Sequence, residues 1–220
     1  LRGRCNIELC LTQCGRHELE DDILVPLLPL PAGRFQSRAS IEELAGDEGT
    51  AMRLVSVLGA SPALTDHLAR HPDHWRQLAD PTLGTTRPAA YVFRASLLEA
   101  VGAKPTDENP VATVPDAEAV DALRVEYRRW LLRLVARDLA HQLPVDDVAA
   151  ELSDLACATL DAALAVARAR VGVDADKVRL AVVAMGKCGG HELNYVSDVD
   201  VIFAHEAADG VGDDVSLRVA

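Results

Sequence analysis

The chain has 220 residues, of which 49% are hydrophobic and only 4% are aromatic, and its formal net charge is −12 at pH 7. Such a chain can bury a sizeable core of Leu, Val and Ala, and this composition favours helices. The negative charge argues against nucleic acid as a partner, because acidic surfaces repel phosphate backbones. No segment approaches the roughly 20 apolar residues of a membrane span, so we expect no membrane partner.

The cysteine pattern indicates a reducing compartment. An odd, scattered set argues against a disulfide framework, and the set is Cys5, Cys10, Cys14, Cys157 and Cys188. The N-terminal residues also lack the pattern of a signal peptide, so we predict a cytoplasmic location. Cys157 lies in an alanine-rich segment and is expected to be buried and inert.

The first segment, residues 1–40, is predicted to be an irregular leader. Four helix breakers interrupt it: Pro26, Pro29, Pro31 and Gly33. Three cysteines in this segment lack the CxxC spacing of zinc sites, so we favour apolar residues over a metal site there.

A helical pattern begins near residue 41. Met52, Val55 and Leu58 recur at a spacing of three, which predicts the buried stripe of a first helix. Ser61 and Pro62 then have the residue types of an N-cap and a first helical position, so they predict the start of a second helix.

Shorter elements follow. Trp75 and Leu78 indicate one brief helical turn, and a further helix is expected near residues 90–101. Three histidines precede or interrupt the turn: His67, His71 and His74. Pro72 breaks the helix between them and no acidic residue completes a ligand set, so we favour surface histidines over a zinc site.

Two long helices are predicted after a loop at residues 102–115, which is rich in Gly, Pro, Asp and Asn. The first begins at Asp116. Pro144 separates it from the second, which ends near Gly172.

The hydrophobic period then changes from helix to strand. Residues 178–185 form a short apolar run with β-branched residues, which predicts a buried strand, and residues 199–203 predict a second strand. The expected fold class is α+β: a helical region at 41–172, then the beginning of a second, incomplete domain at 173–220.

The stretch from Met185 to Phe203 carries the residues suited to chemistry. Asp198 and Asp200 are two positions apart, so on a strand both point to the same face. Two adjacent carboxylates repel each other, and burying them without a partner is costly. A divalent cation removes this conflict, and carboxylate oxygens suit Mg²⁺ or Mn²⁺. We therefore predict that both are metal-binding and catalytic residues.

A glycine turn precedes the two carboxylates. Gly189 and Gly190 follow the first strand, and glycine allows the backbone to approach a phosphate closely and present N–H groups to it. Ser197 offers a further hydrogen bond. A Gly-Gly turn, a short spacer and Asp-x-Asp on a strand look like the signature of polymerase-β-like nucleotidyltransferases.

The longer string is more specific. Met185-Gly-Lys, followed by Gly-Gly-x-Glu-Leu-Asn-Tyr-x-Ser-Asp-x-Asp-x-Ile-Phe, resembles the glutamine synthetase adenylyltransferase family. Leu58-Gly-Ala-Ser-Pro62 and Leu131–Leu139 resemble helical segments of the same family. The resemblance covers roughly residues 50–206.

The resemblance implies a nucleotidyltransferase domain and a specific reaction. Members have two catalytic halves, and Asn194 stands where the C-terminal half usually has Gly, which indicates the N-terminal half. That half removes AMP from glutamine synthetase by phosphorolysis and gives ADP, while the other half adds AMP from ATP. The implied partners are glutamine synthetase, ATP or ADP, phosphate and a nitrogen-signalling protein.

The family comparison also suggests roles for two turn residues, each with an alternative. Lys187 would offset developing charge, or it is a solvated turn lysine. Asn194 would position substrate, or it caps its own backbone.

The chain departs from the family pattern in three respects. Cys188 and His191 replace the Leu and Arg of many members; both lie in the turn, where such variation is harmless or, in the case of His191, alters phosphate contacts. A third metal carboxylate belongs on a later strand, and Asp213 and Asp214 are too close in sequence to fill that role. The site is therefore predicted to be incomplete and the chain to be a fragment. Two alternatives stay open: a non-catalytic docking module for glutamine synthetase or a nitrogen-signalling protein, and a nucleotidyltransferase with another substrate.

Overall fold

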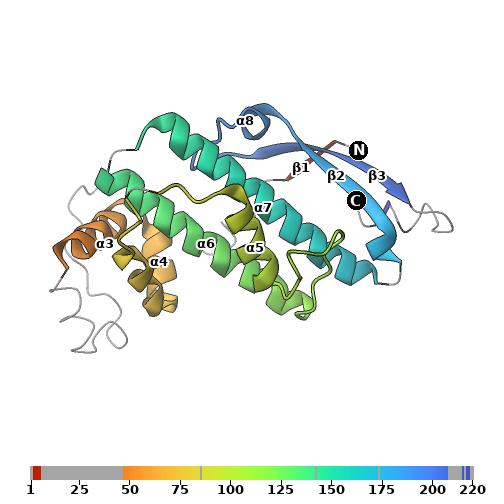
Figure 1. Ribbon diagram of the computed structural model, residues 1–220, viewed down its shortest axis with the longest axis horizontal. Helices are drawn as coiled ribbons and strands as arrows, with labels where there is room; N and C mark the ends of the chain where they lie inside the picture. Colours follow the sequence, from red (N-terminus) through yellow and green to blue (C-terminus); the bar gives the residue numbers. More distant parts are fainter. Residues whose placement is uncertain are drawn as a thin grey trace, which may run out of the picture. The chain divides into compact units, whose positions relative to one another are not determined.

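The computed structural model describes residues 2–5, 47–84, 86–141, 143–172, 174–207, 215 and 217–218. These residues form an α+β structure that is mostly helical, with one antiparallel sheet (Figure 1). Apart from residues 2–5, the predicted leader lies outside the described residues, and so do Cys10, Cys14, Asp213 and Asp214. None of the described helices is both long and apolar enough to cross a membrane.

A strand at Arg2–Cys5, within the segment predicted to be irregular, was not expected, and after it the elements follow the predicted order of helices and then strands. In chain order they are β1 (Arg2–Cys5), α3 (Glu48–Ala60), α4 (Pro62–Arg70), η1 (Pro72–Ala79), α5 (Ala90–Ala100), α6 (Asp116–His141), α7 (Val145–Val171), η2 (Ala175–Lys177), β2 (Val178–Ala184), α8 (Gly186–Gly189) and β3 (Val199–Ala207).

Two compact units divide these elements. One contains β1, Arg87–Trp130 and the chain from Pro144 onward; the other contains the described residues from Asp47 to Thr86 together with Leu131–Leu143. The first unit holds the sheet, and the second is helical. Each is described by itself below.

Helix α4 of the helical unit begins as its sequence predicts. The Ser61 hydroxyl accepts a hydrogen bond from the Leu64 N–H, and Pro62 occupies the first turn. This arrangement satisfies one orphan N–H at the helix start, while proline has no N–H to lose.

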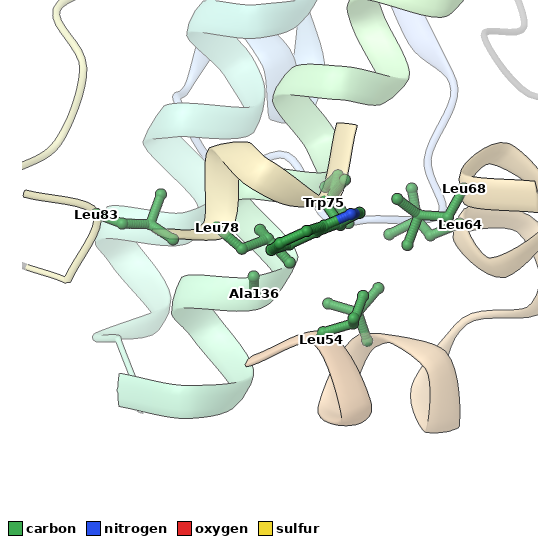
Figure 2. Packing of buried hydrophobic residues seen from close by; sticks show 9 residues of the cluster. Leu54, Leu64, Leu68, Trp75, Leu78, Leu83 and Ala136 are labelled. Carbon is green, nitrogen blue, oxygen red and sulfur yellow. The ribbon is translucent and has the colours of Figure 1, made fainter. Parts of the chain in front are cut away.

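A hydrophobic cluster holds the helical unit together (Figure 2). Its buried members come from α3, α4, η1, the following turn and α6: Leu54, Val57, Leu64, Leu68, Trp75, Leu78, Leu83, Leu132 and Ala136. The Trp75 ring lies among these aliphatic side chains and is 2% exposed. The brief helical turn predicted at Trp75 and Leu78 is confirmed, and both residues are buried.

The predicted buried stripe of α3 was wrong for Met52 and Val55, whereas Leu58 is partly buried against the cluster. Met52 is 59% exposed and Val55 is 56% exposed, whereas Leu54 and Val57 are buried. The side of α3 that carries Thr50 and Leu54 faces η1, as Thr50 hydrogen-bonds to the Leu78 carbonyl. The packing partner thus selected one of two apolar faces that the sequence offered.

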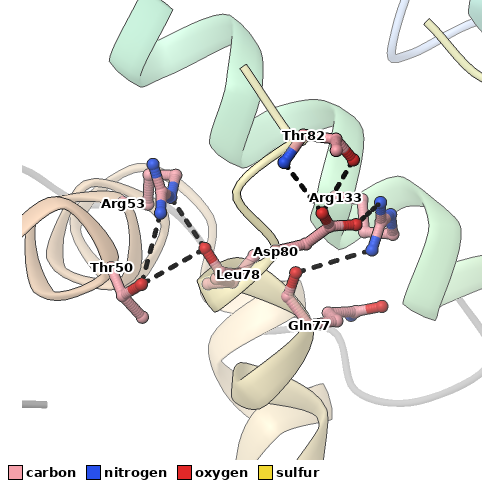
Figure 3. Close-up of polar contacts among 7 residues, drawn as sticks. All are labelled: Thr50, Arg53, Gln77, Leu78, Asp80, Thr82 and Arg133. Carbon is pink, nitrogen blue, oxygen red and sulfur yellow. Dashed lines mark hydrogen bonds and ion pairs between the residues drawn. The ribbon is translucent and has the colours of Figure 1, made fainter. Parts of the chain in front are cut away.

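A polar network lies beside this cluster (Figure 3). Asp80 accepts hydrogen bonds from the Arg133 guanidinium at 2.9 Å, the Thr82 N–H at 2.9 Å and the Thr82 hydroxyl at 2.7 Å. The bond from Arg133, followed by those from Thr82, lowers the pKa of Asp80 to about 2. The ionised carboxylate is therefore stabilised in the folded state.

We expect Asp80→Asn to destabilise the chain by about 1–2 kcal/mol at pH 7. A shift of one pKa unit corresponds to about 1.4 kcal/mol. We reduce the free energy obtained from the lowered pKa, because the Asp80 side chain is 32% exposed and solvent screens its interactions. A lowered pKa contributes stability that is complete above the unfolded value, near 3.8, and is lost as pH falls toward 2. Urea unfolding between pH 7 and pH 3 should show the native and variant curves converging.

Asp73→Asn is the matched control for this measurement. Asp73 also pairs with an arginine, Arg76, but its side chain is 83% exposed, so its removal should change the unfolding free energy little. A difference between native and Asp80→Asn that stays constant down to pH 3 would contradict the prediction.

Arg168 of α7 fixes the segment that leads into the sheet. Its side chain is 3% exposed and donates to the Asn109 side-chain oxygen at 3.0 Å and to the Val178 carbonyl at 3.3 Å. It also donates to the Pro110 carbonyl. One buried guanidinium thus ties the loop at 102–115 to the first residue of β2.

The sheet has the strand order β1-β3-β2, and both pairings are antiparallel (Figure 1). The register places Val183 opposite Ile202 and Val182 opposite Phe203. The prediction that β2 is a buried strand was wrong, because Val183 is 47% exposed and Ile202 is 39% exposed. β2 is an edge strand whose outward face the described residues leave uncovered, whereas Val178 on its other face is buried.

Candidate active site

The predicted glycine turn lies between β2 and β3. It forms the short helix α8, and the Met185 N–H donates to the Asp200 carbonyl at 2.8 Å. This bond continues the β2–β3 ladder by one step. The start of the turn and the carboxylate-bearing end of β3 are therefore held side by side (Figure 1).

Gly186 and Asp200 are in close contact. Gly186 has a φ of +54°, a left-handed conformation that favours glycine, and a Cβ built at this position would lie 3.3 Å from Asp200 Oδ2. The carboxylate of Asp200 thus lies against the backbone of the turn. This contact joins the two parts of the motif that the sequence showed only as neighbours along the chain.

Asp198 and Asp200 are both exposed. Val199, which lies between them, is 0% exposed, and Val201, which follows Asp200, is 3% exposed. This alternation is that of a half-buried strand. The valines anchor the start of β3 while the carboxylates remain accessible from the open face.

The chemistry of this donor set fits a hard divalent cation in part. Two carboxylates near each other suit Mg²⁺ or Mn²⁺. However, no group of three or more His, Cys, Asp or Glu side chains among the described residues is arranged to hold a metal. A cation here would therefore take only two protein carboxylates from this part of the chain.

The residues predicted to bind phosphate surround the same turn. The N–H of Gly189 donates to the Met185 carbonyl and that of Gly190 to the Gly186 carbonyl, both at 3.0 Å. The Ser197 hydroxyl donates to the Asp198 carbonyl, also at 3.0 Å. These donors are thus used within the protein, and the two glycines contribute the absence of side chains rather than free N–H groups.

Lys187 and Asn194 are both exposed. Lys187 lies in α8 itself, and its carbonyl accepts the Glu192 N–H at 2.7 Å, which closes the turn. Asn194 lies between the turn and β3. Neither side chain is buried, so both are available to a ligand.

Helix α7 supports the turn through contacts that the sequence did not predict. The Ser153 hydroxyl accepts the Leu193 N–H at 3.4 Å, and Asp154 Oδ1 lies 3.8 Å from His191 Nδ1. One turn further along α7 lies Cys157, and a hydrogen bond from the Cys188 thiol of α8 lowers the pKa of Cys157 to about 7. Ser153 and Cys157 are four residues apart and so lie on the same face of a helix, and this spacing was the sequence signal that could have indicated a contact face on α7.

The prediction that Cys157 is buried was wrong. Cys157 is exposed, whereas Cys188 of α8 is only 3% exposed. The neighbours of Cys157, Ala156 and Ala158, are buried, so the alanine-rich composition did not determine which side of α7 is exposed.

Gly189→Ala should destabilise the chain by about 1–3 kcal/mol, which is the usual cost of overpacking. A Cβ at Gly189 would lie 2.4 Å from the Ala184 carbonyl oxygen, and this obstacle is backbone at the end of β2. Relief of the clash requires the turn to move away from the strand. Urea unfolding monitored by circular dichroism measures the effect.

Gly59→Ala is its control. A Cβ at Gly59 meets nothing within 4 Å, and Gly59 lies in α3. Alanine is favoured over glycine in helices by up to about 1 kcal/mol, so this variant should be at least as stable as the native chain. A Gly189→Ala protein as stable as the native one would show that the turn is not packed as described.

The three histidines form a cluster in the helical unit. Their ring centroids are separated by 4.9–5.2 Å, and His67 Nε2 lies 3.0 Å from His74 Nδ1. The interpretation as surface histidines was wrong for His67, which is 1% exposed. The chain bends at Pro72 and so brings His74 back onto α4, a contact that helical spacing does not predict.

Comparison with known proteins gives a consistent family. The model of glutamate-ammonia ligase adenylyltransferase matches residues 51–218. A Streptomyces coelicolor protein is 52% identical over 157 residues, which cover 71% of this chain and 14% of the relative. A Streptomyces avermitilis protein is 48% identical over 168 residues, which cover 76% of this chain and 15% of the relative. A Cutibacterium acnes protein is 45% identical over 183 residues, which cover 82% of this chain and 18% of the relative.

All three relatives bear the name bifunctional glutamine synthetase adenylyltransferase/adenylyl-removing enzyme. The matched part of the chain spans only 14–18% of the length of these relatives.

Proposed function

Because the chain belongs to the glutamate-ammonia ligase adenylyltransferase family, we propose that it contributes to the active site that removes AMP from adenylylated glutamine synthetase. The reaction is phosphorolysis: inorganic phosphate displaces the protein hydroxyl from the AMP phosphorus and gives ADP. A linked catalytic half adds AMP from ATP. The fold that carries this chemistry is the beginning of a polymerase-β-like nucleotidyltransferase domain.

One observation carries the proposal: the Asp200 carboxylate lies against the Gly186 backbone, with Asp198 exposed two residues before it. A phosphoryl group that approaches the carboxylates therefore also meets a turn whose glycines have no side chains to obstruct it. The Val183 and Ile202 side chains leave the same face of the sheet open beside the carboxylates.

Asp198 and Asp200 would hold Mg²⁺ or Mn²⁺. When bound, the ion supplies Lewis-acid polarisation of the phosphoryl oxygen and neutralises charge that builds up during transfer. The carboxylates also orient the reacting group, since the buried Val199 and Val201 fix the start of β3, which carries Asp200 and follows directly after Asp198.

The remaining residues bind and position substrate. Lys187 is exposed in the turn and offsets phosphate charge. Asn194 and Ser197 lie on the connection to β3; the Ser197 hydroxyl, which donates to the Asp198 carbonyl, steadies the backbone at the first carboxylate. Asn194, which differs from the Gly usual in the family's C-terminal half, supports the assignment to the adenylyl-removing half.

The test is ADP release. Adenylylated glutamine synthetase, phosphate and Mg²⁺ are incubated with the chain, and nucleotides are separated by chromatography. We expect ADP that depends on phosphate, because simple hydrolysis would give AMP instead. The same assay is run on a longer natural chain that continues past Ala220. Absence of ADP from both proteins would overturn the proposal.

A non-catalytic docking module is the second candidate. It is favoured by the absence of a three-ligand metal group among the described residues. A docking module should bind glutamine synthetase in isothermal titration calorimetry equally well with Mg²⁺ or with a chelator, and should release no ADP when extended past Ala220.

A further inference from the structure

Two adjacent residues of α7 hold the connection between α8 and β3, and the proposed reaction gives neither of them a role. The buried Ser153 hydroxyl accepts the Leu193 N–H at 3.4 Å and donates to the Ala149 carbonyl at 2.9 Å. Next to it, Asp154 Oδ1 lies 3.8 Å from His191 Nδ1. All of these residues belong to the same compact unit. The connection that leads to the carboxylates is therefore fixed from α7 at two neighbouring positions.

Asp154 contacts two partners, one through each carboxylate oxygen. Oδ2 accepts a hydrogen bond from the Arg87 guanidinium at 2.6 Å, whereas Oδ1 faces His191. The Asp154 side chain is only 14% exposed, so solvent and salt screen these interactions less than those of a surface pair. Arg87 fixes the carboxylate and also offsets its negative charge, which would otherwise repel an anion near His191.

The backbone of His191 has a conformation that residues other than glycine rarely adopt. Its φ is +56°, in the left-handed region. Such a conformation costs energy and persists only where the surroundings hold it, which is common at functional sites. The His191 side chain is 58% exposed, and the ring nitrogen that faces Asp154 is Nδ1. The strained backbone thus presents an imidazole to solvent with Nδ1 directed at α7.

We propose that Asp154 is a positioning residue that orients His191 to bind a phosphate oxygen through Nε2. A carboxylate beside Nδ1 favours the tautomer with the proton on that nitrogen. Because the two ring nitrogens point in diverging directions, Nε2 points away from Asp154 and is left for a ligand. In the neutral ring, Nε2 accepts a hydrogen bond from a protonated phosphate oxygen, and in the protonated ring it donates one.

The class of ligand rests on the proposed function. His191 directly follows Gly189 and Gly190, the turn that the proposed reaction brings against the phosphoryl group. Two molecules of that reaction share the chemistry that Nε2 would recognise: inorganic phosphate and the phosphate of AMP. The two are tested separately below.

A second ion pair on α7 provides a matched control. Arg94 donates to Asp161 Oδ2 at 2.9 Å, and each member lies seven residues after its counterpart in the Arg87–Asp154 pair. Seven residues are about two helical turns, so both aspartates lie on the same side of α7. Asp161→Asn therefore removes an equivalent ion pair at a distance from His191.

NMR of the histidine side chains tests the orientation. The ¹⁵N-labelled chain is titrated with inorganic phosphate and, in a separate experiment, with AMP, and a His191→Gln variant assigns the His191 signals. We expect the tautomer with the proton on Nδ1, and an Nε2 signal that shifts with one of the two ligands. Asp154→Asn should weaken this binding about tenfold, the effect of losing one charged interaction. Asp161→Asn should stay within about twofold of native.

Arg87→Gln guards against a folding defect in Asp154→Asn. It keeps Asp154 and His191 but removes the guanidinium that fixes the carboxylate, so binding should weaken by less than in Asp154→Asn. The proposal is overturned if neither ligand shifts the His191 signals of the native chain. Native-like binding by Asp154→Asn, or an equal loss in Asp161→Asn, would overturn it as well.

ADP release separates failure of this inference from failure of the proposed function. In the longest natural chain that releases ADP, Asp154→Asn should raise the KM for the ligand identified by NMR, phosphate or adenylylated glutamine synthetase, and change kcat little, because the residue acts on binding. An unchanged KM in an active enzyme would overturn the role of Asp154 and leave the proposed function intact. A ligand-dependent shift of His191 without ADP from any chain would support the positioning role and count against the proposed function.

Discussion

Asp198→Asn should reduce ADP release from adenylylated glutamine synthetase by about 10³-fold or more. A metal ion contributes several kcal/mol of charge stabilisation in such reactions, and each 1.4 kcal/mol corresponds to about a tenfold change in rate. Asparagine keeps the size of the side chain but removes the charge that binds the cation. The variant is assayed in the longest natural chain that releases ADP, with saturating phosphate and varied Mg²⁺.

Structure should be unaffected by this change, because Asp198 is exposed and its backbone lies outside the β3 ladder. Glu206→Gln is the matched control, since it removes a carboxylate further along β3 that pairs with Arg179 on the surface. We expect activity within about twofold of native for this variant, as exposed pairs contribute little. An Asp198→Asn enzyme that keeps more than a tenth of native activity would contradict the assignment of Asp198.

Trp75→Ala should destabilise the helical unit by about 3–5 kcal/mol, the range measured for deletion of large buried side chains. The Trp75 ring is 2% exposed and lies among Leu54, Leu64 and Leu78 (Figure 2). Its removal leaves a cavity at the place where three helical elements meet. Urea unfolding followed by far-ultraviolet circular dichroism gives the change in free energy.

Met52→Ala is the control for Trp75→Ala, and it also tests which face of α3 is buried. Met52 is 59% exposed, so its truncation should change the free energy of unfolding by no more than about 0.5 kcal/mol. Equal losses from Met52→Ala and Trp75→Ala would show that α3 packs through the stripe predicted from its spacing and not through Leu54.

Local signals in the sequence were sufficient for most element boundaries. Ser61 and Pro62 start α4, Pro144 precedes α7, and Gly172 ends it, as expected. These residues act within one or two turns of backbone, through a cap, a fixed φ or a missing Cβ, so no distant partner is needed to interpret them. The predicted change from helix to strand near Val178 is also confirmed, because the hydrophobic period of a segment is likewise a local property of its sequence.

Burial was less predictable where a helix or strand carried more than one apolar face. Leu54 rather than Met52 is buried in α3 because η1 packs on that side. Val183 of β2 is exposed because the described residues cover only the other face of the sheet. Periodicity reports which residues are apolar, whereas the packing partner decides which of them leave solvent.

The candidate site divides in the same way. The sequence by itself determined the two carboxylates at strand spacing and the glycines before them, because this motif depends only on the residue types within one short stretch. Only the tertiary structure placed Asp200 against Gly186, used the N–H groups of Gly189 and Gly190 within the turn, and brought Ser153 to Leu193. These contacts depend on the β2–β3 pairing and on the packing of α7 against α8, which join residues that are far apart in the chain.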